Sequence, residues 1–170
     1  MMKKICCLIF SLFLLFSLFS CSGAHRGYDY AGIAKRAFSA RLFGEWYGVR
    51  TEARIEMREA QGDTRDFYIH FLSGSLSGVI VRREGDSVRI STGGVEERDF
   101  YAGGLCDIAK LFCPDDCAPV RVDKSNGTGV LSAKADGLEF YVTVREDGVP
   151  QSIECEGLFS FEVKEFGLIK

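Results

Sequence analysis

Histidine is scarce and the common catalytic motifs are missing from this chain of 170 residues. Its two histidines, His25 and His70, do not stand beside a nucleophile motif such as G-x-S-x-G. The chain also lacks H-E-x-x-H, a phosphate-binding glycine loop and a dinucleotide fingerprint. We therefore expect no enzymatic activity, no catalytic residue and no cofactor.

Clusters of basic residues are missing too. The formal net charge is −3, and it becomes −5 without Lys3 and Lys4, the only charged residues before Cys21. An acidic chain without a basic patch is a poor match for nucleic acid. It also gains nothing from an anionic membrane surface, so membrane attachment would have to come from a covalent lipid.

A hydrophobic run long enough to span a bilayer is absent from the start of the chain. Lys3 and Lys4 precede an uncharged run from Ile5 to Phe19. This run of about fifteen residues is shorter than the roughly twenty that a membrane-spanning helix needs. A short positive region followed by a short apolar run is typical of an export signal that is later removed.

The end of this run, Leu18-Phe19-Ser20-Cys21, resembles the lipobox of bacterial lipoproteins. The resemblance implies a signal peptide over residues 1–20, a diacylglycerol anchor on Cys21 and a short tether over 21–27. It places the protein in the cell envelope, on the outer side of the cytoplasmic membrane or in the outer membrane. The alternative is a plain secretory signal in which this cysteine has no special role.

Four cysteines belong to the remaining domain, residues 28–170. An even number in an exported chain favours two disulfides over free thiols. A zinc site is the third alternative, but the paired C-x2-C spacing of structural zinc sites is absent, so we expect no metal. The pairing that we expect is Cys113 with Cys117 and Cys106 with Cys155.

The residue pattern predicts a single α+β domain. Apolar residues at helical spacing predict a helix from Tyr28 that ends near Gly44. Alternating apolar and polar residues then predict about eight or nine antiparallel strands, broken by one short helix before Pro114. Asn-Gly and Asp-Gly pairs between the later strands predict tight hairpins.

One face of such a sheet must be buried, and two helices cover only a few strands. The uncovered apolar face must close on itself, pack on a second layer or line a cavity. We therefore expect an apolar, ligand-binding cavity under the first helix. The residues predicted to line it are Tyr47, Val49, Ile55, Met57, Phe67, Ile69 and Phe71.

The order of these elements, from Tyr28 to the end of the chain, resembles the lipoprotein-carrier family (LolA/LolB-like), which includes lipid-binding lipoproteins. The resemblance implies a strongly curved, half-barrel-like sheet whose concave apolar face binds or transfers a lipid or another hydrophobic ligand. The alternative function is that of an envelope-surface structural or protein-interaction domain with a solid core, whose protein partner the sequence does not identify.

Overall fold

The computed structural model of the protein describes residues 27–59, 65–98 and 103–169. The predicted signal peptide, the predicted lipid site Cys21 and the tether up to residue 26 lie outside these ranges. Residues 60–63, whose sequence Ala60-Gln61-Gly62-Asp63 predicts a turn, lie outside them too.

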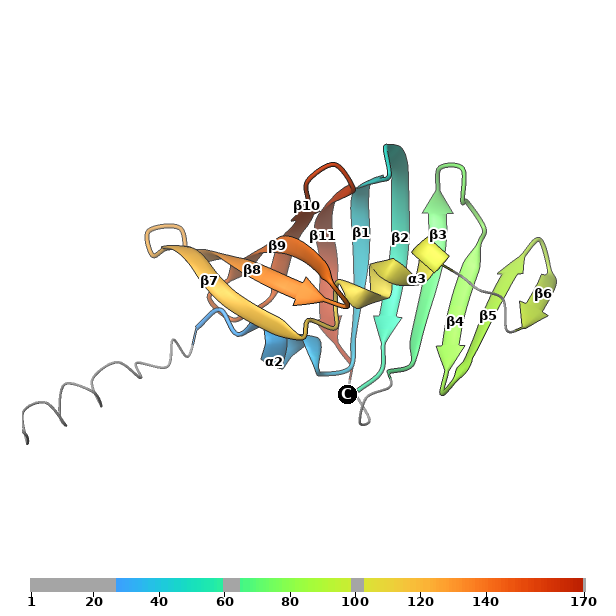
Figure 1. Ribbon diagram of the computed structural model, residues 1–170, viewed down its shortest axis with the longest axis horizontal. Coiled ribbons are helices and arrows are strands. Elements are labelled where there is room, and N and C mark those ends of the chain that lie inside the picture. Colours follow the sequence, from blue (N-terminus) through green and yellow to red (C-terminus); the bar gives the residue numbers. More distant parts are fainter. Residues whose placement is uncertain (1–26, 60–64, 99–102, 170) are drawn as a thin grey trace, which may run out of the picture.

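Eleven antiparallel strands form one open, curved sheet in the described part of the chain (Figure 1). The order of the strands is β6-β5-β4-β3-β2-β1-β11-β10-β9-β8-β7, so the first and last strands pair in the middle and the chain meanders outward on either side. The strands are β1 (Phe38–Trp46), β2 (Val49–Met57), β3 (Phe67–Ser73), β4 (Ile80–Glu84), β5 (Ser87–Thr92), β6 (Val95–Arg98), β7 (Asp116–Asp123), β8 (Thr128–Ala135), β9 (Leu138–Arg145), β10 (Pro150–Cys155) and β11 (Phe159–Leu168).

The two faces of the sheet differ in polarity because side chains alternate along each strand. Ala40, Ile55, Ile69 and Val81 stand opposite one another across β1–β4, and each of them is buried. We call the face that carries them the inner face and the opposite, largely charged face the outer face. The α+β architecture and the curved antiparallel sheet agree with the sequence prediction, although the sheet has more strands than predicted.

The predicted first helix is mostly wrong. Helix α2 covers only Tyr30–Ala34, and the chain becomes β1 at Phe38. Phe38 and Leu42 are spaced equally well for one helix face and for one strand face, so the sequence is ambiguous there. Pairing decides the matter, because β1 hydrogen-bonds with β2 on one side and with β11 on the other.

The predicted short helix before Pro114 is confirmed as α3, Gly103–Lys110, which links β6 to β7. The sequence Cys113-Pro114-Asp115-Asp116-Cys117 also predicts a tight loop, and this prediction is only partly correct. Strand β7 already begins at Asp116, and Cys117 pairs with Ala133 of β8. No helix in the described ranges is long and apolar enough to cross a membrane.

The predicted hairpins fit the structure. β7 and β8 pair around Asn126-Gly127, and β8 and β9 pair around Asp136-Gly137. Asp136 has φ +49° and Gly137 has φ +78°, the left-handed conformation that tight hairpin turns require. These turns fix the register that places apolar residues on the inner face.

Candidate functional site

The inner face of β2 and β3 brings together five of the seven residues predicted to bind a ligand. Ile55, Met57, Ile69 and Phe71 have no exposed surface at all, and Phe67 has 6%. A side chain that no water molecule reaches does not line an empty cavity. The face that was predicted to be hollow is therefore packed in this structure.

Tyr47 and Val49 do not join this buried group. Tyr47 is 54% exposed and Val49 is 40% exposed. Tyr47 lies in the turn between β1 and β2, with φ +49°, and its ring packs edge-on against Trp46 at 5.1 Å between centroids. The alternation fails for Tyr47, because a turn does not set the direction of side chains as a strand does. Val49 has the parity of the inner face, but it is the first residue of β2 and is exposed at that end of the strand.

The inner face is covered by α3 and the residues after it, together with the short helix α2, whose Tyr30 and Ala34 are buried in the same core. Ile108, Leu111 and Phe112 have no exposed surface, and the ring of Phe112 lies 5.2 Å from that of Phe38 on β1. The strip from α3 to Phe112, which we call the cover segment, therefore occupies the place where a ligand was expected. Beside it, Trp46 stacks on Phe159 at 5.3 Å and on Phe161 at 5.9 Å.

A single arginine, Arg65, joins the ends of several elements. Its guanidinium donates to the carbonyl oxygens of Arg36 at 2.6 Å, Arg58 at 2.6 Å and Phe112 at 2.9 Å, and also to that of Ala34. Among the described residues, no carboxylate pairs with it.

The carbonyls at the ends of α2 and of the cover segment have no partner within their own helices, so a buried cation that donates hydrogen bonds to them stabilises both ends. Sequence analysis missed Arg65. Its partners come from three separate segments, of which only Arg58 is near in sequence, and no local pattern marks such a residue.

The four cysteines are free thiols in the structure, so neither predicted disulfide is present in it. Cys113 and Cys117 flank the buried Tyr30, whose hydroxyl donates to the carbonyl of Leu111 at 2.5 Å. Burial and these two thiols raise the pKa of Tyr30 well above its ordinary value.

Burial together with the neighbouring Asp116 raises the pKa of Cys117 to about 11. Cys106 lies on the cover segment near Arg83, whereas the thiol of Cys155 contacts the carbonyl of Glu139 at the end of β10. These different surroundings explain why Cys106 and Cys155 do not pair.

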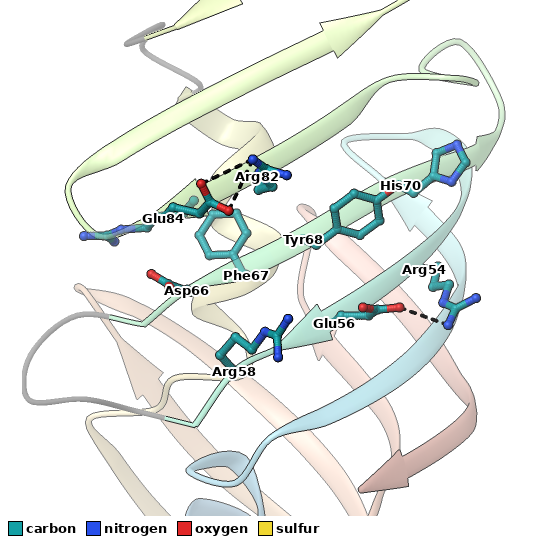
Figure 2. Close-up of a pocket in the computed structure, with 10 residues that line it drawn as sticks. Arg54, Glu56, Arg58, Asp66, Phe67, Tyr68, His70, Arg82 and Glu84 are labelled. Carbon is teal, nitrogen blue, oxygen red and sulfur yellow. Dashed lines mark hydrogen bonds and ion pairs between the residues drawn. The ribbon is translucent and has the colours of Figure 1, made fainter. Parts of the chain in front are cut away.

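The outer face of β2–β4 carries a depression of about 410 Å³, shown in Figure 2. Its side chains are mostly charged. They include Arg54, Glu56 and Arg58 from β2 and the residue after it, Tyr68 and His70 from β3, and Arg82 and Glu84 from β4. In the described ranges, no group of three His, Cys, Asp or Glu side chains is placed to hold a metal ion.

Comparison with known proteins gives a fold but no family. No protein-family model matches the sequence, and no curated protein matches it. An uncharacterized conserved protein from Thermus thermophilus is similar in structure, with 19% identity over 84% of this chain and 85% of that chain and a TM-score of 0.50.

Two further likenesses are weaker. The Pseudomonas aeruginosa MucA/MucB complex matches 82% of this chain and 54% of that chain at 18% identity and a TM-score of 0.45. A DUF1329 family protein from Desulfovibrio piger ATCC 29098 matches 84% of this chain and 91% of that chain at 12% identity and a TM-score of 0.42. Likeness at such low identity concerns the fold alone.

Proposed function

We propose that this domain binds an apolar ligand, such as the acyl chain of a lipid, against the inner face of β1–β4 after the cover segment has moved aside. In this proposal Cys21 carries a lipid that anchors the domain in the cell envelope, and no catalytic step is involved. The observation that supports it most is the contrast between a wide apolar face and the short helix that covers its centre.

The cover segment is held by packing and not by intrinsic helix stability. Helix α3 has eight residues and begins with Gly103-Gly104. Isolated helices shorter than about 12 residues are marginal in water. The segment is therefore expected to lose its helical structure once it leaves the sheet.

The energies of the two occupants can be compared. Burying one large apolar side chain contributes about 1.5–3 kcal/mol, so Ile108, Leu111 and Phe112 together hold the cover segment with about 5–9 kcal/mol. A chain of about fourteen buried CH₂ groups contributes about 11 kcal/mol at about 0.8 kcal/mol each. Burial of such an acyl chain thus contributes enough free energy to offset the lost contacts of the cover segment.

A second candidate function is that of a protein-interaction domain with a permanently solid core. The observation that favours it is the complete burial of Ile55, Met57, Ile69 and Phe71. In that case the cover segment is part of the core, and no apolar ligand enters.

Two matched substitutions separate the candidates. Ile108 on α3 and Ile153 on β10 are both fully buried, so Ile→Ala removes the same atoms at each site and lowers stability by about 2–5 kcal/mol. Only Ile108→Ala weakens the docking of the cover segment. Binding of a fluorescent fatty acid to the full-length protein in a non-ionic detergent is the measurement.

The proposed function predicts that Ile108→Ala binds the fatty acid at least about tenfold more tightly than the parent, because a loss of 1.4 kcal/mol in the competing contact corresponds to a factor of ten. Ile153→Ala should not bind more tightly than the parent. If neither the parent nor Ile108→Ala binds, the solid-core function is the correct one.

A further inference from the structure

The depression on the outer face, which we call the outer pocket, is separate from the ligand site proposed above. Its side chains come from three neighbouring strands and point away from the core (Figure 2). The backbone register places Arg54 opposite His70 and Tyr68 opposite Arg82. Charged groups from different strands therefore surround one open space of about 410 Å³.

The negative charges in the outer pocket already have partners. Glu56 pairs with Arg54 at 2.9 Å, and Glu84 pairs with Arg82 at 3.2 Å. The carboxylate of Asp66 accepts a hydrogen bond from the backbone N–H of Gly85 at 2.7 Å. Each acidic side chain of the pocket is thus occupied by a donor of the protein itself.

Two basic side chains of the outer pocket, by contrast, have no hydrogen-bond or ion-pair partner among the described residues. Within residues 27–59, 65–98 and 103–169, the side chains of Arg58 and His70 form no hydrogen bond or ion pair, and His70 only lies edge-on to Tyr68, at 6.4 Å between ring centroids. Arg58 and His70 are therefore the side chains of the pocket whose donors remain open to a ligand, although the numbers of arginines and carboxylates in the pocket are nearly equal.

The neighbouring strand carries a further arginine, Arg89, whose terminal nitrogen pairs with Glu96 at 3.4 Å. Arg89 on β5 stands directly opposite Arg82 on β4, and like charges in this position destabilise a sheet. The Nε of Arg89 is buried and has no hydrogen-bond acceptor among the described residues. An anion bound near this row would offset the repulsion between the two arginines.

We propose that the outer pocket binds a phosphate group, with Arg58 and His70 as its main ligands and Arg54 and Arg82 at its rim. The planar fork of a guanidinium matches the oxygens of a phosphate. Arg58 lies beside Asp66, and His70 lies four residues farther along the chain, so a phosphate in the middle of the pocket reaches both only when the two side chains turn toward it. The ion pairs of Arg54 and Arg82 are half exposed to solvent and hold these side chains only weakly, so both arginines can turn toward a bound phosphate. The phosphate belongs either to a small soluble molecule or to a lipid head group.

Nuclear magnetic resonance of the histidine rings tests this site in the full-length protein. The chain has two histidines, so His25 serves as the internal reference for His70. The protein, in a non-ionic detergent, is titrated with inorganic phosphate and with glycerol 3-phosphate, and separately with micelles that contain phosphatidylglycerol. We expect saturable shifts of the His70 signals that weaken as salt is added, because exposed charges are screened.

Two exposed variants give the contrast. Arg58→Gln should weaken binding at least about fivefold, because a hydrogen bond to a charged group is lost. Arg121→Gln, on the distant edge strand β7, should leave binding unchanged. If the His70 signals shift at a lower total phosphate concentration with phosphatidylglycerol than with the soluble phosphates, the ligand is a lipid head group. The reverse order indicates a soluble ligand.

Two results would overturn the proposal. One is that His70 shifts no more than His25 with any of the three probes. The other is that Arg58→Gln and Arg121→Gln bind the phosphate probes with the same affinity. Both results concern side chains of the outer face and of the distant strand β7, so they leave the proposed function of the inner face untouched.

Discussion

Replacing Arg65 with methionine should be the most damaging single change away from the sheet itself. Methionine keeps an apolar stem of similar length, but it donates no hydrogen bond to the carbonyls of Arg36, Arg58 and Phe112. These acceptors lie at or just beyond the ends of α2, of β2 and of the cover segment, and the carbonyls at the end of a helix have no partner within that helix. The substitution therefore loosens three elements at once.

The expected loss can be worked out from these contacts. A hydrogen bond to a charged group contributes about 1.5–3 kcal/mol, but the contributions are not additive, and burying the guanidinium itself has a cost. We expect Arg65→Met to lower the free energy of unfolding by about 3–5 kcal/mol, which corresponds to a fall in Tm of about 6–20 °C for a domain of this size.

Urea unfolding followed by circular dichroism measures this loss. Arg54→Met is the matched control, because the Arg54 side chain is exposed and its ion pair with Glu56 contributes at most about 1 kcal/mol. If Arg65→Met loses less than about 1 kcal/mol, the hydrogen bonds of Arg65 do not hold these elements together, and the physical reasoning is wrong.

Four further predictions concern the sheet, the acid limb, the thiols and the anchor. Gly44→Ala should lower stability by about 2 kcal/mol or more, because its Cβ would lie 1.8 Å from a β11 carbonyl oxygen, whereas Gly167→Ala, with open space around it, should be neutral in the same urea titration. A hydrogen bond from Lys110 lowers the pKa of Asp136. The pair therefore stabilises the fold above the ordinary carboxyl pKa, and this stabilisation is lost as the pH falls through the lowered value. In a plot of the free energy of unfolding against pH, Asp136→Asn should decrease less steeply on the acid side than the parent. Alkylation in urea without reductant, followed by mass spectrometry, should label all four thiols of the domain, and the finding of two disulfides would contradict the structure. Cys21→Ser should move the protein from the membrane fraction to the soluble fraction, and a variant that stays in the membrane would refute the lipid anchor.

Much of the sheet was predictable because alternation is a local property. Along β2 the charged side chains of Arg50, Glu52 and Arg54 separate small or apolar residues one by one, and no helix has that period. The turn pairs Asn126-Gly127 and Asp136-Gly137 fixed two hairpins in the same local way.

The remainder depended on contacts that the sequence does not show. β1 is a strand because β2 and β11 flank it, and its own spacing of Phe38 and Leu42 fits a helix equally well. The burial of Ile55 and Phe71 was foreseen, but a cavity was inferred because nothing in the sequence showed that Ile108 and Phe112 would fill the space. Arg65 and the outer pocket were missed for the same reason, since their partners come together only in the folded chain.

The movement of the cover segment is the central claim, and hydrogen exchange of its backbone amides tests it most directly. Full-length protein in a non-ionic detergent is exchanged with and without saturating fatty acid, and the amides of Asp107 to Lys110 are compared with those of Ala53 to Ile55 on β2. If the ligand takes the place of the cover segment, the α3 amides lose protection when fatty acid is added and the β2 amides keep theirs, because an isolated helix of this length does not hold its hydrogen bonds. Unchanged or increased protection of α3 under saturating ligand would contradict the account.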